Sequence, residues 1–263
     1  MSEPAGVTGP TQVSVPTPDG EMPALLWEPP PATGGGGDGE QGAADRPALV
    51  VLQEIFGLSH FVQARSADLA GLGYLVLAPR LYWRLPEVTI DEQAPDFVEQ
   101  ALATMQRLDW DTAVADARTA LSHARSLAGS DQPAGIVGFC FGGGLGFAAA
   151  AGAEPDPAVL VSYYGSALPR LTELAPQVRC PSLHHFGTAD DYLPMPEVER
   201  ITEAVTAGGT REDVEVHLHE GAGHAFDNPH PGFHHPQASA RAWAQTQDFL
   251  ARYLPAGGSP SSR

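Results

Sequence analysis

The sequence predicts an α/β fold with a mainly parallel central sheet and helices on both of its faces. From Ala48 onward, short apolar runs of strand length alternate with amphipathic stretches of helix length, which is the order of successive βαβ units. The chain has 263 residues, of which 43% are hydrophobic. That is enough for a sizeable core, and α/β proteins of this length often form one domain. We therefore expect a single domain over residues 1–263.

The expected elements follow from this alternation. Two extended segments, 12–16 and 22–28, precede the alternating part of the chain. Further strands are expected at 48–53, 74–78, 134–138, 158–163, 181–186 and 214–219. Helices are expected at 60–72, 94–107, 110–127, 142–151, 196–207 and 234–253. Residues 29–47 and 255–263 have too few apolar side chains to offset their ordering entropy, so we expect a flexible loop and a disordered tail there.

Charge and cysteine content narrow the class of protein. The chain carries 32 acidic and 14 basic residues, a net charge of −18 that repels nucleic acids and anionic membranes. No stretch approaches the roughly 20 apolar residues that cross a bilayer. Two cysteines and no apolar leader after Met1 predict a cytoplasmic protein, the alternative being a Cys140–Cys180 disulfide. We expect a monomer or small homo-oligomer with a small-molecule substrate.

Residues 138–144, Gly-Phe-Cys-Phe-Gly-Gly-Gly, have the pattern of a nucleophile elbow in which Cys140 replaces the usual serine. A buried strand precedes the motif and a small, apolar helix follows it, as an elbow requires. The following helix N-terminus favours an anion, which would help to form the thiolate. The alternative is a buried structural cysteine among glycines that allow close packing. We interpret Cys140 as the candidate nucleophile.

A catalytic thiol needs a base, and the base needs an orienting acid. His224 follows the last strand on a glycine-bordered loop, and Asp190 follows the fifth strand of the alternating part. Loops at the carboxyl ends of parallel strands form the ligand crevice, so these residues can meet there. Asp191 remains an alternative acid, and His224 could instead be a surface histidine. The ten histidines lack a metal-binding spacing such as H-E-x-x-H, so we expect neither a metal nor another cofactor.

Five segments in the same order together resemble the dienelactone hydrolase family. They are Gln53-Glu54-Ile55-Phe56-Gly57, the segment from Pro79 to Arg84, the Cys140 motif, Gly187-Thr188-Ala189-Asp190 and the segment from Gly221 to Phe226. The likeness spans roughly residues 13–253. It implies an α/β-hydrolase fold with a triad of Cys140, His224 and Asp190. It also favours Asp190 over Asp191, because the family's acid lies three residues after the glycine.

The resemblance also implies roles for Glu54 and Ile55. The matching glutamate pairs with the resting thiol and helps to form the thiolate; a solvated charge at a strand end is the alternative for Glu54. Elbow geometry places the Phe141 N–H in the oxyanion hole, and the resemblance adds the Ile55 N–H as the second donor.

The family's dienelactone enzymes hold a substrate carboxylate with arginines. Arg84 matches one of these, in a Leu-Tyr-x-Arg motif that contains Tyr82, although it could instead be a salt-bridging residue. Two positions depart from the family. Asn228 stands where those enzymes have arginine, four residues after the histidine, and Arg80 replaces the usual aspartate. We take Arg84, Tyr82 and Asn228 as candidate substrate-binding residues.

These inferences predict a hydrolase of a small ester or lactone that forms a thioester acyl-enzyme, with carboxymethylenebutenolidase activity as the specific expectation. A broad carboxylesterase or thioesterase of the same fold is the nearest alternative. A non-hydrolytic redox or ligand sensor that uses Cys140 belongs to a different class, and such a sensor often has a resolving cysteine. Cys180, which lies just before a predicted buried strand, is poorly placed for that role.

Overall fold

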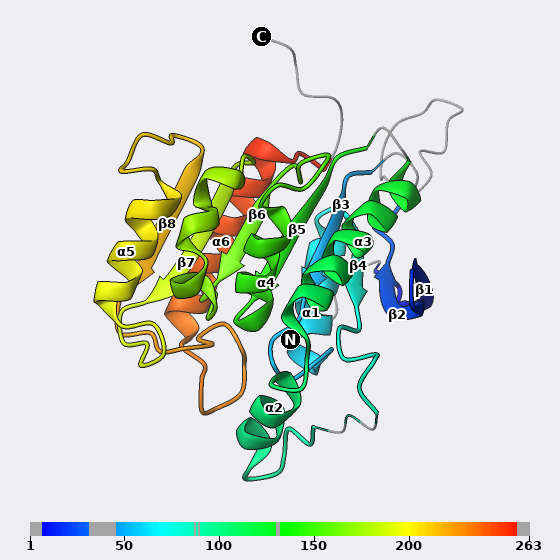
Figure 1. Ribbon diagram of the computed structural model, residues 1–263, viewed down its shortest axis with the longest axis horizontal. Helices are drawn as coiled ribbons and strands as arrows, with labels where there is room; N and C mark the ends of the chain where they lie inside the picture. The colour runs from blue at the N-terminus through cyan, green and yellow to red at the C-terminus, as the bar shows by residue number, and fades with distance from the viewer. Residues whose placement is uncertain (1–6, 32–45, 87, 89, 130–131, 257–263) are drawn as a thin grey trace.

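The computed structural model describes residues 7–31, 46–86, 88, 90–129 and 132–256. Eight strands form one sheet in the order β1-β2-β4-β3-β5-β6-β7-β8 (Figure 1). The strands are β1 (Thr11–Thr17), β2 (Gly20–Trp27), β3 (Ala48–Leu52), β4 (Leu75–Pro79), β5 (Ala134–Phe139), β6 (Leu160–Tyr163), β7 (Ser182–Gly187) and β8 (Val214–His219). Strands β1 and β2 form an antiparallel hairpin, and β2 pairs antiparallel with β4. The remaining strands, β4, β3, β5, β6, β7 and β8 in sheet order, are parallel.

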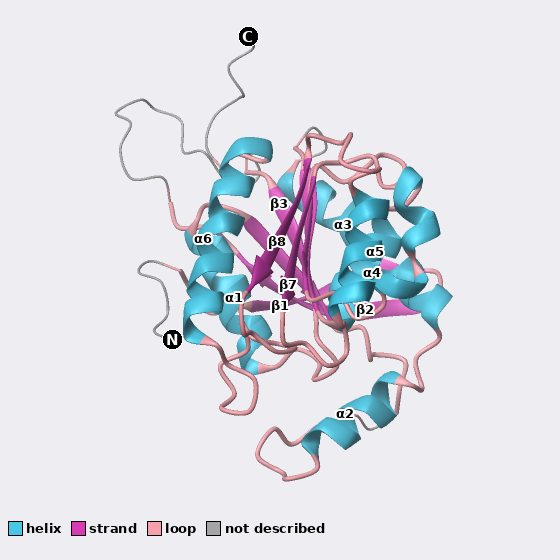
Figure 2. Cartoon of the chain, turned by 90° about the vertical axis from the view of Figure 1, so that its left-hand side faces the viewer, coloured by secondary structure: helices cyan, strands magenta, loops and turns pink. Residues whose placement is uncertain are grey.

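Helices cover both faces of the sheet. They are α1 (His60–Gly71), α2 (Phe97–Met105), α3 (Trp110–Ala128), α4 (Phe141–Ala150), α5 (Met195–Val205) and α6 (Pro236–Tyr253). Figure 2 shows α1 and α6 on one face, with α3, α4 and α5 on the other, and α2 set apart from both layers. Every residue of the central strands β3 and β5 is buried, because helices exclude water from both faces of these strands.

Local sequence explains where several helices begin. The Ser59 side chain caps α1 by accepting from Val62 N, and the Asp109 side chain caps α3 by accepting from Thr112 N. At the start of α6, the His235 side chain accepts from Ala238 N, and Pro236 takes the first helical position, where no backbone donor is needed.

The expected strands and helices are all confirmed, with bounds that differ by a few residues. The helix expected at 94–107 is shorter, because α2 covers only Phe97–Met105. Two 3₁₀ helices, η2 (Leu168–Arg170) and η3 (Thr172–Gln177), were not expected. Most of the loop expected at 29–47 and of the tail expected at 255–263 lies outside the described residues. Within the described ranges, no helix is both long and apolar enough to cross a membrane.

Candidate active site

Cys140 occupies a sharp turn between β5 and α4. Its backbone has φ 52° and ψ −113°, in the left-handed half of φ space, which is uncommon for a residue with a side chain. Glycines make this turn possible: a Cβ on Gly138 would lie 2.1 Å from the Gly142 carbonyl oxygen. A Cβ on Gly142 would in turn lie 2.2 Å from the Leu52 oxygen, so the elbow packs directly against the end of β3.

His224 and Asp190 meet Cys140 at this end of the sheet. His224 Nε2 lies 3.1 Å from Cys140 Sγ, and His224 Nδ1 lies 2.7 Å from Asp190 Oδ2. The other carboxylate oxygen of Asp190 accepts backbone hydrogen bonds from Tyr192 at 2.8 Å and Leu193 at 3.1 Å. The contact with His224 is therefore made by Asp190, whose orientation is fixed by its own loop.

The contact between Asp190 and His224 requires the loops after β7 and β8 to approach each other closely. Ala189 N donates to the Ala222 carbonyl at 2.9 Å, and a Cβ on Gly187 would lie 2.2 Å from that same oxygen. A buried ion pair also connects the loop after β8 to α1, because Arg65 Nε donates to Asp227 Oδ2 at 2.8 Å. These contacts fix His224 relative to Asp190.

The electrostatics of the three residues favour a charged imidazole. Burial alone would lower the pKa of His224, but the Cys140 thiolate and the hydrogen-bonded Asp190 carboxylate raise it to about 10. His224 is therefore protonated over the neutral pH range while it contacts Cys140.

Glu54 is fully buried beside this cluster, which rules out a solvated strand-end charge. Its carboxyl oxygens accept from the Tyr164 hydroxyl at 3.2 Å and from Asn228 Nδ2 at 2.7 Å. Burial raises the pKa of Glu54 to about 7, although the Asn228 hydrogen bond, the nearby His224 and the Tyr164 hydrogen bond oppose the increase. Cys140 Sγ faces His224 in this conformation, and no hydrogen bond joins it to Glu54.

Phe141 and Ile55 are the residues expected to supply the two backbone donors of an oxyanion hole. Phe141 begins α4 immediately after Cys140, and Ile55 lines the same cavity as Cys140. Neither N–H donates to a backbone carbonyl within the described part of the chain. Tyr82 helps to position the backbone of Ile55, because its hydroxyl donates to the Ile55 carbonyl at 2.8 Å.

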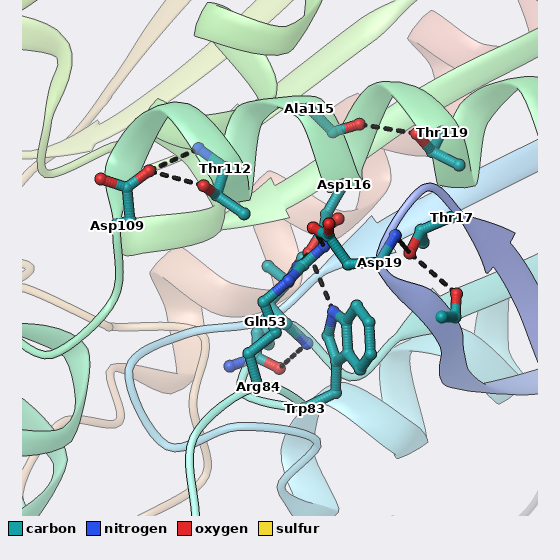
Figure 3. A network of polar contacts seen from close by, with 12 residues as sticks. Thr17, Asp19, Gln53, Trp83, Arg84, Asp109, Thr112, Ala115, Asp116 and Thr119 are labelled. Atoms are coloured by element: carbon teal, nitrogen blue, oxygen red, sulfur yellow. Dashed lines mark hydrogen bonds and ion pairs between the residues drawn. The ribbon is translucent and has the colours of Figure 1, made fainter.

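Arg84 lies outside this site, and its predicted role as a carboxylate clamp is not supported by its position. Figure 3 shows its guanidinium between Asp116 of α3 and Asp19 of the β1–β2 turn. It forms ion pairs with both carboxylates, the one with Asp19 at 2.8 Å, and stacks 4.1 Å from the Trp83 ring. The salt-bridging alternative therefore describes Arg84, since both terminal nitrogens of its guanidinium bind carboxylates.

Tyr82 and Asn228 are likewise not placed to bind a substrate directly. Tyr82 is buried against Ile55, and Asn228 donates to Glu54 while its own carbonyl oxygen accepts from His230 N at 3.0 Å. Both residues position parts of the site instead. Neither lines the cavity that Cys140 faces.

That cavity has a volume of about 660 Å³, and both Cys140 and His224 line it. Part of its apolar wall comes from α2, through Val98, Leu102 and Met105. Sequence patterns identified α2 as a helix but gave no sign that it faces the site. Tyr164 and Ser166 were also missed, although both follow β6 at the carboxyl end of a parallel strand, which is the one signal that could have found them.

The second cysteine has a different environment. Cys180 is a free, buried thiol, as Cys140 is, so the alternative of a disulfide between them is wrong. Burial raises the pKa of Cys180 to about 12. It is a poor nucleophile and a poor partner for thiol exchange.

Comparison with known proteins identifies the family of this chain. The family model described as "Dienelactone hydrolase family" matches residues 39–254. The chain belongs to the dienelactone hydrolase family. It is a hydrolase, and its relatives include the carboxymethylenebutenolidase of Pseudomonas putida, which is 35% identical over 214 residues, 81% of this chain and 89% of the relative. Carboxymethylenebutenolidase 1 of Cupriavidus pinatubonensis is 33% identical over 206 residues, 78% of this chain and 86% of the relative.

Solved structures show the same fold. A crystal structure from Klebsiella pneumoniae, provisionally named as a dienelactone hydrolase, superimposes with a TM-score of 0.77 at 24% identity and covers 94% of this chain and 99% of its own. A dienelactone hydrolase-like promiscuous phosphotriesterase from metagenomic libraries gives a TM-score of 0.71 at 20% identity, covering 95% and 99%. The predicted α/β-hydrolase fold is therefore confirmed.

Proposed function

We propose that this enzyme hydrolyses a small ester or lactone of the dienelactone type through Cys140, His224 and Asp190. One observation carries the proposal: at an elbow with φ 52°, Cys140 Sγ lies 3.1 Å from His224 Nε2 at the wall of a cavity of about 660 Å³. A thiol in hydrogen-bond contact with a base, beside a space that can hold a substrate, is the arrangement that nucleophilic catalysis requires.

In the first half of the reaction, His224 holds the proton of Cys140, and the thiolate attacks the carbonyl carbon of the substrate. The Phe141 and Ile55 N–H groups stabilise the oxyanion, and Asp190 stabilises the imidazolium. When the tetrahedral intermediate collapses, the carbon–oxygen bond of the ester breaks and His224 protonates the departing oxygen. In a lactone, that oxygen stays tethered to the acyl group of the thioester.

In the second half, water replaces the leaving group. His224 takes a proton from the water as its oxygen attacks the thioester carbon, and the carbon–sulfur bond breaks to release the acid and restore the thiolate. A lactone thus leaves as one ring-opened hydroxy or keto acid. Glu54, whose pKa of about 7 lets it gain or lose a proton near neutrality, serves as an alternative acceptor for the thiol proton in the resting enzyme.

Replacing the nucleophile tests the proposal. Cys140→Ala is expected to lower kcat by at least about 10³-fold for trans-dienelactone and for 4-nitrophenyl acetate, because no group remains to form the acyl-enzyme. Cys180→Ala, the matched control, should retain activity since that thiol is buried. Mass spectrometry should find an acyl adduct on Cys140 after treatment with an activated ester.

Hydrolysis of both substrates by Cys140→Ala at near wild-type rate would refute the mechanism. The ratio of the two substrates' kcat/KM distinguishes a dienelactone hydrolase from a broader carboxylesterase. Peroxide-driven pairing of Cys140 with Cys180 without turnover would instead support the thiol-sensor alternative.

A further inference from the structure

The distribution of cations around the catalytic cavity is uneven. The chain contains no lysine, so all 14 of its basic side chains are arginines. Arg84, the arginine that the family resemblance implied for substrate binding, is occupied by Asp19 and Asp116. Among the residues that line the cavity of Cys140, Arg170 is the one arginine. In the part of the chain that the structure describes, Arg170 is thus the one permanent cation on the wall of this cavity.

Arg170 is placed on a segment that the nucleophile elbow holds in position. It ends η2, which follows β6. Within that connection, Ser166 N donates to the Cys140 carbonyl at 3.1 Å. A Cβ on Gly144 would lie 2.5 Å from Ala167 Cβ, so α4 and this segment are in direct contact. The backbone that carries Arg170 is thus fixed relative to Cys140.

The side chain of Arg170 contacts Trp110, which in turn contacts Phe141 of the nucleophile elbow. Its guanidinium carbon lies 5.8 Å from the centre of the Trp110 ring, and that ring meets Phe141 edge-on at a centroid distance of 5.9 Å. Trp110 thereby connects Arg170 with the residue whose N–H is proposed to bind the oxyanion. Such a cation–π contact orients a guanidinium while leaving its N–H groups available.

Within the described ranges, no carboxylate forms an ion pair with Arg170. At least one carboxylate pairs with each of Arg65, Arg84, Arg179, Arg200, Arg211 and Arg252. Arg170 is also exposed, so a ligand can reach it. The cavity's two carboxyl residues, Glu54 and Asp191, would repel an anion, as would the net charge of −18. Arg170 is therefore the arginine of this cavity that is free to bind an acidic substrate away from the His224–Asp190 pair.

We propose that Arg170 is the specificity-determining residue that binds the carboxylate of an acidic ester or lactone while its carbonyl lies against Cys140. The inference rests on the proposed hydrolysis at Cys140. The guanidinium fork matches a carboxylate through two parallel N–H donors, which a lysine could not reproduce. Neutral esters use the apolar wall formed by α2 and do not need Arg170.

A matched pair of esters tests this directly: mono-(4-nitrophenyl) succinate and its neutral methyl ester. Arg170→Gln is expected to raise KM for the anionic ester about 10-fold, with kcat and the KM of the neutral ester changed less than about twofold. Arg170→Lys should recover only part of the loss. Arg241→Gln, which removes an exposed arginine of α6 outside the cavity, should change neither ester's KM. Equal effects of Arg170→Gln on both esters would overturn the proposal.

A second measurement does not require turnover. Alkylation of Cys140 by 3-maleimidopropionic acid and 6-maleimidohexanoic acid is compared with alkylation by their methyl esters, followed by intact-protein mass spectrometry in a Cys180→Ala background. Arg170→Gln should lower the acid-to-ester rate ratio at least about fivefold at one of the two lengths, whereas Arg84→Gln and Arg241→Gln keep it. An unchanged ratio in Arg170→Gln at both lengths, or an equal loss in Arg84→Gln, would overturn the role of Arg170. If the wild type hydrolyses neither succinate ester, the proposed hydrolysis fails, and the maleimide ratio still decides the anion site.

Discussion

The Cys140 cluster (Cys140, His224 and Asp190) and the Arg84 cluster (Arg84, Asp116, Asp19 and Trp83) are both built from polar groups brought together by tertiary contacts. They differ in whether the central side chain has space beside it for a ligand. Arg84 has a carboxylate on two sides and an indole against its face, so its charge is already neutralised. Cys140 Sγ has His224 on one side and an open cavity on the other. Access to a cavity, and not charge density, separates a reactive cluster from a structural one.

The largest expected effect comes from removing the base of the Cys140 cluster. His224→Gln should lower kcat about 10³- to 10⁴-fold for a neutral 4-nitrophenyl ester, because the thiol loses its proton acceptor and the leaving group loses its acid. His60→Gln, an exposed histidine at the start of α1, is the matched control and should leave kcat unchanged. A decrease below about tenfold in His224→Gln would show that another group, such as Glu54, activates the thiol.

The sequence was most informative where function depends on contacts between near neighbours or on strand ends. The elbow could be predicted because its strand, its cysteine and its glycines are contiguous. Asp190 and His224 could be predicted because loops after parallel strands converge at one edge of a sheet. Arg84 follows β4 and satisfies the same rule, yet its position does not support the predicted substrate-binding role, because it pairs with carboxylates that are distant in sequence, 65 residues before it and 32 after it. A local sequence pattern does not reveal whether a long side chain will pair with a distant carboxylate or point into a cavity.

Glu54 adds a third case to this comparison, because its carboxyl group is buried and forms no ion pair with a described residue. The pKa of Glu54 is 4.5 in an unfolded chain and about 7 here, so between these values the folded state binds more protons than the unfolded state. The contribution of Glu54 to stability therefore falls as pH rises from about 4.5 to about 7 and then levels off. Glu54→Gln should remove this dependence and raise the free energy of unfolding by about 2–3 kcal/mol at pH 8, but by less than about 1 kcal/mol at pH 5.

Denaturant unfolding of both proteins at the two pH values measures this difference. Glu99→Gln, which removes an exposed carboxylate from α2, serves as the control and should show no comparable gain at pH 8. A Glu54→Gln protein that is equally stabilised at both pH values would mean that Glu54 does not titrate in this interval. Kinetics of the same variant then report separately whether the carboxyl group assists the thiol.

The smallest effect is expected in the Arg84 cluster, and it should appear in stability alone. Arg84→Gln leaves the Asp116 side chain, only 4% exposed, with a hydrogen bond from Trp83 Nε1 but no cation. We expect a loss of about 2 kcal/mol in the free energy of unfolding, since an unpaired buried carboxylate is costly. Asp19→Asn should cost less than about 0.5 kcal/mol, because the Asp19 side chain is 64% exposed and water replaces its partner.

Both Arg84 cluster variants should keep the wild-type KM for anionic and for neutral esters, measured at a temperature well below unfolding. We expect the opposite result for Arg170→Gln. Because Arg170 pairs with no buried acid, its loss should change the KM of the anionic ester without changing the free energy of unfolding. A rise in KM for the anionic ester in Arg84→Gln would place the substrate carboxylate at Arg84 and require its ion pairs with Asp19 and Asp116 to open on binding. Because opening would leave Asp116 unpaired in its buried position, the bound substrate would have to offset that cost, whereas Arg170 can bind an anion without breaking an existing ion pair.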